Sequence, residues 1–304
     1  MNKYLSLTKR NCLVFLRDRS SVFFSLLSML IVMILTGVFL GNMNVDSITN
    51  LLAEYGGTRN TVTDTENAKE LVFYWTLAGI LVVNSLTVSL TVIGTMITDT
   101  AENRLERFYT APMSKALVSL SYVTSAIFIG TLFCLITLGL ALIYIGCTGG
   151  TVLSLSAILK IVAYIFLNVC IFSIIMYLAA LFTKSSSAWS GIATIMGTLV
   201  GFLGAIYVPT GALPDKVTTV LSYLPVLHGT SLMRKVCCDS ILRKTFQGMP
   251  ENVIDIYKEE MGITVVMKNV TVTSVFQLLF MVGCGVAAFI AVLLVTRKRN
   301  ISDR

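Results

Sequence analysis

The sequence predicts an all-α membrane protein with six transmembrane helices. Six stretches contain no Asp, Glu, Lys or Arg, and each meets the roughly 20 residues that a helix needs to cross a bilayer core of about 30 Å. A charged residue at mid-span would cost about 2.5 to 3.5 kcal/mol on insertion, so the absence of charged residues from six runs indicates helices embedded in lipid. Composition agrees, with 55% hydrophobic residues and a mean hydropathy of +0.82. The expected spans are 22–41, 71–98, 116–146, 161–183, 188–208 and 275–296.

The distribution of basic residues predicts that both termini are cytoplasmic. The net charge is +7, but topology depends on where Lys and Arg lie relative to the spans. They gather before the first span, after the second and after the last, whereas the opposite short loops hold Arg59, Lys69 and Lys160. An even number of spans leads to the same arrangement. The long loop after the fifth span is not counted, because long loops cross membranes largely regardless of charge.

Cysteine and histidine usage argues against a metal site. Three of the seven cysteines lie inside spans, no C-x-x-C occurs, and His228 is the one histidine, so we do not expect a Cys/His metal site. Cys237 and Cys238 lie in the same outer region as Cys147, which allows a disulfide from Cys237 or Cys238 to Cys147. We expect the chain itself to bind no cofactor.

Two further absences restrict the chemistry. The chain has no G-x-x-x-x-G-K-[ST] and therefore no P-loop for nucleotide phosphates. The spans also lack the titratable groups that an intramembrane enzyme or an ion-coupled carrier commonly uses. We therefore expect a non-catalytic subunit, whose energy for any transport comes from another protein.

The loop between the second and third spans predicts a short amphipathic helix over 99–111. Asp99 and Glu102 have the spacing of a helix start that resembles a capping box, and Pro112 would end the helix. The apolar side chains Leu105, Phe108 and Tyr109 recur at helical spacing, while Arg104 and Arg107 share a neighbouring face. One interpretation is a helix on the membrane surface. The other is a knob that fits a groove on a cytosolic partner.

Two other segments border the spans. Lys3, Arg10 and Arg17 repeat at seven residues, which favours an interfacial helix attracted to anionic lipid. Residues 211–235 are partly apolar but contain Pro214 and Pro225, so we expect a hairpin that dips into the outer leaflet and not a seventh span. The remaining loop, 236–274, is expected to be exposed, with a helix near 252–260.

Polar stripes follow one face of the second and fifth spans. Their spacing of three and four residues places the members of each stripe on one helical face. Small and hydroxylated residues commonly mediate helix packing, and Gly197 and Gly201 have the small-xxx-small spacing. Alternatively, the two stripes line an uncharged, mildly polar passage. The candidates for that path are Asn84, Thr87, Thr91, Thr95, Ser190, Thr194 and Thr198.

Three local patterns give the chain a resemblance to the ABC-2 type permeases, the transmembrane subunits of bacterial ABC exporters. They are Arg17-Asp18-Arg19 before the first span, the stretch RLERFYTAP from Arg104 to Pro112, and Gly211-Ala212-Leu213-Pro214 followed by Leu224-Pro225. The resemblance covers nearly the whole chain and is weakest over 236–274. Such proteins often carry a proline in the first span, and residues 22–41 contain none.

The resemblance implies a role for each segment. Residues 99–111 would be the coupling helix on a separate ATP-binding subunit, through Glu102, Arg104, Leu105, Arg107, Phe108 and Tyr109. The hairpin at 211–235 would close an outer gate, with Leu213, Pro214, Leu224 and Pro225. Two ATP-binding subunits, carrying ATP and Mg, would join this chain and a second permease copy or a paralogue in the bacterial cytoplasmic membrane.

The function implied is ATP-driven export of an apolar, amphipathic or lipid-linked substrate, of the drug, peptide, lipid or glycan class. The uncharged path favours such a substrate over a small ion. Two alternatives stay open. One is a stand-alone channel or secondary carrier, and the other is a membrane anchor subunit without transport activity.

Overall fold

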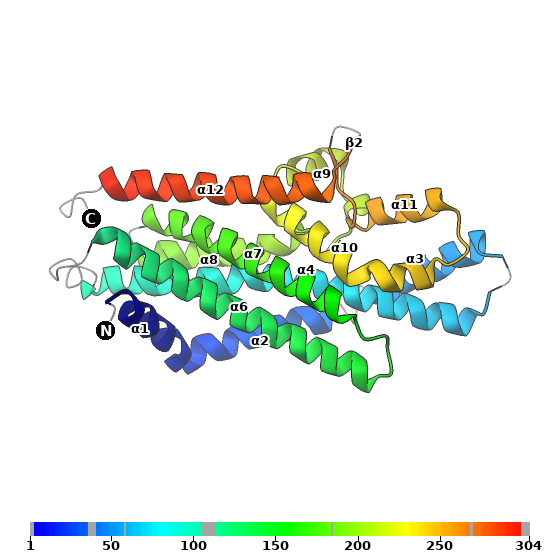
Figure 1. Ribbon diagram of the computed structural model, residues 1–304, viewed down its shortest axis with the longest axis horizontal. Coiled ribbons are helices and arrows are strands. Elements are labelled where there is room, and N and C mark those ends of the chain that lie inside the picture. The colour runs from blue at the N-terminus through cyan, green and yellow to red at the C-terminus, as the bar shows by residue number, and fades with distance from the viewer. Residues whose placement is uncertain are drawn as a thin grey trace.

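A computed structural model describes residues 3–35, 41–57, 59–104, 114–183, 185–267 and 270–298. Long helices dominate it, and they run side by side in one elongated bundle (Figure 1). In chain order the elements are α1 (Lys3–Arg17), α2 (Arg19–Leu35), α3 (Gly41–Tyr55), α4 (Thr61–Ala101), α6 (Lys115–Cys147), α7 (Leu155–Leu181), α8 (Ser186–Leu203), η2 (Thr210–Ala212), α9 (Asp215–Leu221), α10 (Pro225–Thr245), α11 (Glu251–Glu260), β1 (Val266–Met267), β2 (Val270–Thr271) and α12 (Ser274–Lys298).

Five of the described helices are long and apolar enough to cross a membrane, namely α4, α6, α7, α8 and α12. They match the second to sixth expected spans. For the first expected span the structure describes α2, which has 17 residues, and residues 36–40 lie outside the described residues. The chain is therefore a helical, multi-pass membrane protein, and six crossings stay a prediction.

The helix α4 lies at the centre of the bundle. It contacts α1, α2, α3, α6, α7, α8 and α10. Most of its side chains from Leu71 to Ile97 are buried, including Tyr74, Trp75 and Leu81 with no more than 1% of their surface exposed. Its run from Leu71 to Thr98 contains no charged residue, and a helix without a charged face can be surrounded by other helices, which explains this central place.

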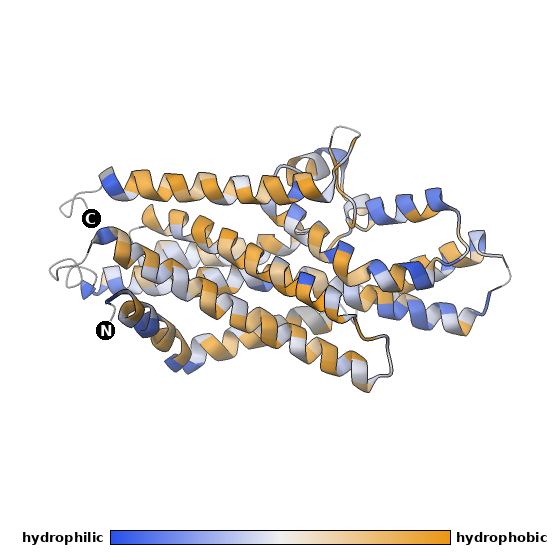
Figure 2. Ribbon diagram, viewed as in Figure 1, coloured by the Kyte–Doolittle hydropathy of each residue, from blue (hydrophilic) through white to orange (hydrophobic). Residues whose placement is uncertain are grey.

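The bundle has two chemically different ends. The start of α1 and the end of α12 lie together at one end, which we call the terminal end (Figure 1). The other, the distal end, holds α3, α11 and the beginning of α4. Figure 2 shows hydrophobic residues along the middle of the long helices and hydrophilic ones concentrated at the distal end and in α1. This distribution is typical of a protein whose middle lies in lipid.

The fifth expected span, 188–208, was too long. In the structure α8 ends at Leu203, and Ala205 takes a left-handed φ of 50° that reverses the chain. The reversal is stabilised by packing, because Ile206 lies on Gly79 of α4 and the ring of Tyr207 covers Gly201. Hydropathy could not reveal this end, since the residues after it are also apolar.

After α8 the chain builds a small unit at the distal side of the bundle. The interval 211–235 contains η2, α9 and the first half of α10, and α10 continues to Thr245, past the boundary expected for the hairpin. The helix expected near 252–260 is confirmed as α11. The strands β1 and β2 pair as an antiparallel hairpin. Cys237 and Cys238 are buried in α10 and, like Cys147, are free thiols.

Arg234 connects this unit to the bundle. Its side chain is fully buried, and its guanidinium lies 4.0 Å from the centre of the Trp75 ring. It donates hydrogen bonds to the carbonyl oxygens of Ala205 (2.7 Å) and Met261 (3.1 Å), which stand at the carboxyl ends of α8 and α11. Helix carboxyl ends carry partial negative charge, so two of them, together with the aromatic ring, stabilise the buried cation.

We expect Arg234→Ala to lower the free energy of unfolding by about 3 kcal/mol, because it leaves buried carbonyl groups without donors and opens a cavity. The measurement is unfolding in detergent, followed by circular dichroism. Arg243→Ala is the matched control, since Arg243 lies on the exposed side of α10 and pairs with Asp239 at the surface. An equal loss for both variants would contradict the bridging role.

Candidate functional site

The end of α4 differs from the helix start expected there. Asp99 lies in the last turn of α4 and Glu102 is the carboxyl-terminal cap, so the interpretation of these two residues as a capping box is wrong. Asn103 has a left-handed φ of 57°, the conformation that commonly terminates helices. The helix expected over 99–111 therefore does not begin at Asp99, because the apolar core of α4 extends the helix past the charge-free run.

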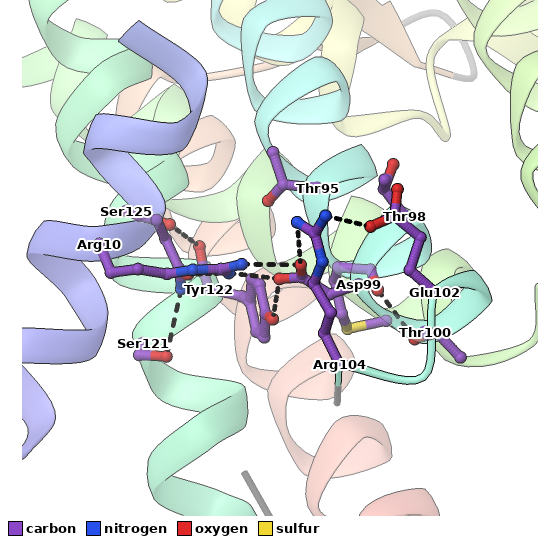
Figure 3. A network of polar contacts seen from close by, with 12 residues as sticks. Arg10, Thr95, Thr98, Asp99, Thr100, Glu102, Arg104, Ser121, Tyr122 and Ser125 are labelled. Carbon is purple, nitrogen blue, oxygen red and sulfur yellow. Dashed lines mark hydrogen bonds and ion pairs between the residues drawn. The ribbon is translucent and has the colours of Figure 1, made fainter. Parts of the chain in front are cut away.

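Asp99 is the centre of a buried polar network at the terminal end (Figure 3). Arg10 of α1 pairs with both carboxylate oxygens, and its Nη2 lies 2.8 Å from Oδ1. The hydroxyl of Tyr122 on α6 donates to Oδ2 at 2.6 Å. Asp99 is 2% exposed, so these partners replace water around its charge. Three elements are thereby joined at one carboxylate.

The helix α1 packs on α6 beside this network. Asn11, which is 1% exposed, donates to the Ser121 hydroxyl at 3.3 Å, and the Tyr4 and Thr124 hydroxyls lie 2.6 Å apart. The hydrogen bonds to Asp99 raise the pKa of Arg10 above its ordinary value. The sequence assigned Arg10 to a lipid-facing basic stripe, whereas the structure pairs it with Asp99.

Arg104 continues the network toward the next segment. Its guanidinium pairs with Glu102, and its Nη1 lies 3.9 Å from Asp99 Oδ1 (Figure 3). The other residues expected to meet a partner, namely Leu105, Arg107, Phe108 and Tyr109, lie outside the described residues. The described end of α4 thus leads directly into the segment expected to carry the coupling helix.

A cleft of about 340 Å³ lies next to the network, bounded by α1, α2, α4 and α8. Thr91 and Thr95 of α4 and Ser190 of α8 all line it, so the structure brings members of both predicted stripes together. Trp189 forms its inner wall, where a Cβ added at Gly94 would come within 2.8 Å of the indole nitrogen. Close approach at this glycine holds the first turn of α8 against α4.

The hydroxyl groups in this cleft are bonded to their own helices. Thr91 donates to the Thr87 carbonyl at 2.9 Å, and Ser190 donates to the Ser186 carbonyl at 3.0 Å. A second, smaller cleft continues between α2 and α4, where Thr87 and Thr91 meet Ser21. Because their protons are already donated, these side chains present carbon atoms and oxygen lone pairs, so this part of the wall is only weakly polar, whereas Asp18, Asp99 and Arg104 line the terminal end of the cleft.

Three of the predicted path residues lie elsewhere. Asn84 is 6% exposed and donates to the Thr137 hydroxyl of α6 at 3.1 Å, so it joins two helices and lines neither cleft. Thr194 and Thr198 lie on the exposed face of α8. Within the described chain no other helix packs on the pair Gly197 and Gly201: a Cβ added at Gly197 would meet no atom within 4 Å, and Gly201 is covered by the Tyr207 ring.

The expected gate residues lie around α9. Pro214 precedes α9, and Leu224 and Pro225 begin α10. Leu213 and Leu224 pack on a small apolar cluster of Ala205, Leu221, Leu227 and Val265. Sequence analysis did not identify Arg234 or the pair of Arg10 with Asp99, because no spacing relates residues that are distant in the chain. Among the described residues, no group of acidic, His and Cys side chains could hold a metal.

The geometry defines a class of protein: a multi-pass helical membrane protein with a weakly polar cleft between two of its spanning helices. The sequence model of the ABC-2 type transporter family matches residues 2–237. The chain belongs to this family and is a membrane subunit of an ABC transporter. Members of the family normally work with ABC ATP-binding subunits. A comparison with curated proteins gives no match.

The Arg10–Asp99 pair should couple α1 to α4 energetically. In a double-mutant cycle with Arg10→Gln and Asp99→Asn, we expect a coupling free energy of about 1 to 3 kcal/mol, since Asp99 is buried. The measurement is the free energy of unfolding in detergent. The exposed pair of Arg243 and Asp239 is the control and should couple by less than about 0.5 kcal/mol. Equal coupling in the two pairs would refute the prediction.

Proposed function

We propose that the chain forms the substrate path of an ATP-driven exporter. The observation that carries this proposal is the cleft in which Thr91 and Thr95 of α4 face Ser190 of α8. The cleft adjoins the end of α4, and α4 continues into the segment expected to meet an ATPase. A movement of that segment would therefore be transmitted to the wall of the path along one helix.

The energy source is a separate ATP-binding subunit in two copies, which carries the ATP and Mg. Their closure on ATP would move residues 99–111, with Glu102, Arg104 and the apolar face of Leu105, Phe108 and Tyr109 against the ATPase. The network of Asp99 with Arg10 and Tyr122 supports this role. Because α1 and α6 are tied to the same carboxylate, they would move with α4.

The substrate is apolar, amphipathic or lipid-linked. The support is the chemistry of the cleft wall, where threonine and serine hydroxyls are bonded within their helices. The carboxylates at the cleft, Asp18 and Asp99, lie toward the terminal end. Hydrogen bonds from Ser21 lower the pKa of Asp18, so it remains ionised. Arg104 lines the same end, so the charged groups stay there, and the rest of the wall, formed by apolar and hydroxyl side chains, suits a substrate with a large apolar part.

A second permease copy or a paralogue completes the path. The outward face of α8 supports this, because Ile195, Leu199 and Phe202 are exposed there beside Thr194 and Thr198. Gly191 and Gly197 on the same helix have open space around them. A partner helix can approach closely at such residues.

The outer gate is formed by Leu213, Pro214, Leu224 and Pro225. Ile206 packs on Gly79 of α4. The charge-free run of α4 begins at Leu71, so at 1.5 Å per residue Gly79 lies about 12 Å inside that run. The α9 segment that follows would thus lie at the depth of the outer leaflet. This depth supports a hairpin that re-enters the membrane.

The protein would lie in the bacterial cytoplasmic membrane with the terminal end in the cytoplasm. Lys9, Arg17 and Arg19 lie at this end, as the positive-inside rule requires.

The coupling role is tested by the double substitution Leu105→Glu with Phe108→Glu. We expect loss of export and of the co-purifying ATPase, with membrane insertion unchanged, because the apolar face is removed without altering a span. The measurement is affinity purification of the tagged chain in mild detergent, followed by mass spectrometry and an ATPase assay. Ile256→Glu with Val270→Glu, two exposed apolar positions of the distal unit, is the control.

Normal transport by the coupling variant would reject the assignment. Recovery of the wild-type chain alone, without ATPase activity, would favour a self-contained channel or an anchor subunit.

The path itself is tested at Thr91. Thr91→Trp should fill the cleft and reduce transport at least about tenfold, whereas Thr91→Val removes only a hydroxyl that is already bonded within its own helix and should retain most of the activity. Transport in proteoliposomes and ATPase activity are measured together. Reduced transport with unchanged assembly of the ATPase would locate the defect in the path. Equal transport by Thr91→Trp and Thr91→Val would contradict the assignment of this cleft to the substrate path.

A further inference from the structure

A second cleft, of about 590 Å³, opens at the distal end of the bundle. It is bounded by α4, α6, the turn between α6 and α7, Val45 of α3 and Lys244 at the end of α10. It shares no lining residue with the hydroxyl-lined cleft at the terminal end. Nothing in the proposed transport path uses it.

One end of this cleft is charged. Glu70 is 9% exposed and accepts hydrogen bonds from the backbone nitrogen and hydroxyl of Thr151. Lys244 Nζ lies 3.5 Å from Glu70 and 3.3 Å from the Thr151 hydroxyl. Both contacts are long, so the Lys244 ammonium can still donate a hydrogen bond to a ligand. Lys69 also lines the cleft, is exposed, and has no hydrogen-bond partner among the described residues. Glu66 lies one turn away on the same helix.

The other end is apolar. Leu77 and Ile80 line it, and the rings of Phe73 and Tyr144 stack at its side with centroids 5.4 Å apart. From Glu66 to Ile80 the cleft follows α4 for about 21 Å. Its charged end lies just before Leu71, where the charge-free run of α4 begins, and its apolar end lies within that run.

We infer that this cleft binds a zwitterionic phospholipid with a phosphate and an ammonium in its head group. The phosphate binds between Lys69 and Lys244, and the ammonium binds at Glu66. The acyl chain lies along the rings of Phe73 and Tyr144, which keep accessible surface at the cleft, with the buried Leu77 and Ile80 behind them. Two lysines and two glutamates line the charged end, so a head group without net charge is matched better than an anion or a cation alone.

The position of the cleft supports a lipid over a soluble ligand. The change from charged to apolar lining coincides with the start of the apolar run, which is where the head group of a membrane lipid meets its acyl chains. Tyr144 is 56% exposed at the side of the cleft, and aromatic residues of this type are enriched at that level of a membrane. The inference does not depend on the proposed transport function.

The test is lipid binding to the full-length chain, purified in mild detergent with its co-purifying subunits and examined by native mass spectrometry. The probes are phosphatidylethanolamine, diacylglycerol with the same acyl chains, and free phosphoethanolamine. We expect phosphatidylethanolamine to bind at least about tenfold more tightly than either fragment. The double substitution Lys69→Gln with Lys244→Gln should weaken the binding of phosphatidylethanolamine by about tenfold and so remove most of that preference.

Matched controls separate binding from folding. Arg243→Gln removes the neighbouring surface cation of α10, outside the cleft, and should leave binding unchanged. Lys69→Gln alone changes an exposed side chain and should weaken binding severalfold without loss of stability. At the apolar end, Tyr144→Ala should weaken binding, whereas Ile143→Ala, the exposed neighbour outside the cleft, should not.

Equal binding of diacylglycerol and phosphatidylethanolamine would overturn the inference, as would an equal loss of binding in Arg243→Gln and in the double variant of Lys69 and Lys244. Free phosphoethanolamine that binds as tightly as the lipid would show a site for a soluble ligand and would also overturn it. Each of these outcomes is independent of the ATPase and transport measurements.

Discussion

Burial of α4 is the constraint on which the rest of the structure depends. A backbone in lipid must satisfy its hydrogen bonds internally, so the spans are helices. Among the described spans α4 is the most completely enclosed, and its sequence permits this because it carries no charged side chain between Leu71 and Ile97. The other helices arrange around it, and Gly79 and Gly94 allow α8 and its following turn to approach closely.

The charged groups of α4 are concentrated near its two ends, and the charge buried near each end is stabilised differently. At the terminal end Asp99 is neutralised by Arg10 and bonded to Tyr122. At the distal end the cation of Arg234 has no carboxylate among its described partners and is stabilised by carbonyl groups at two helix ends and by Trp75. Both arrangements join α4 to elements that lie outside the expected spans, so they determine how those elements are held.

Much of the fold could be predicted from local sequence, and the errors have a common cause. The expected spans over 71–98, 116–146, 161–183 and 275–296 coincide with long helices, because a charge-free run has no stable alternative in lipid. The end of α8 and the nature of Asp99 were misjudged. In both cases contacts between distant residues are involved: Ile206 packs on Gly79 after the end of α8, and Arg10 pairs with Asp99 in the last turn of α4. Hydropathy and capping patterns describe only neighbours in the chain.

The sequence by itself determined that this is a helical membrane protein with two hydroxyl-bearing helix faces, since charge-free length and helical periodicity are local properties. It also contained the patterns that resemble ABC-2 permeases. Tertiary structure decided which stripe residues share a cleft, bringing Thr91 and Thr95 to Ser190 and turning Asn84 toward Thr137. The reason is that periodicity assigns residues to a face of a helix, whereas packing against the other helices decides what that face meets.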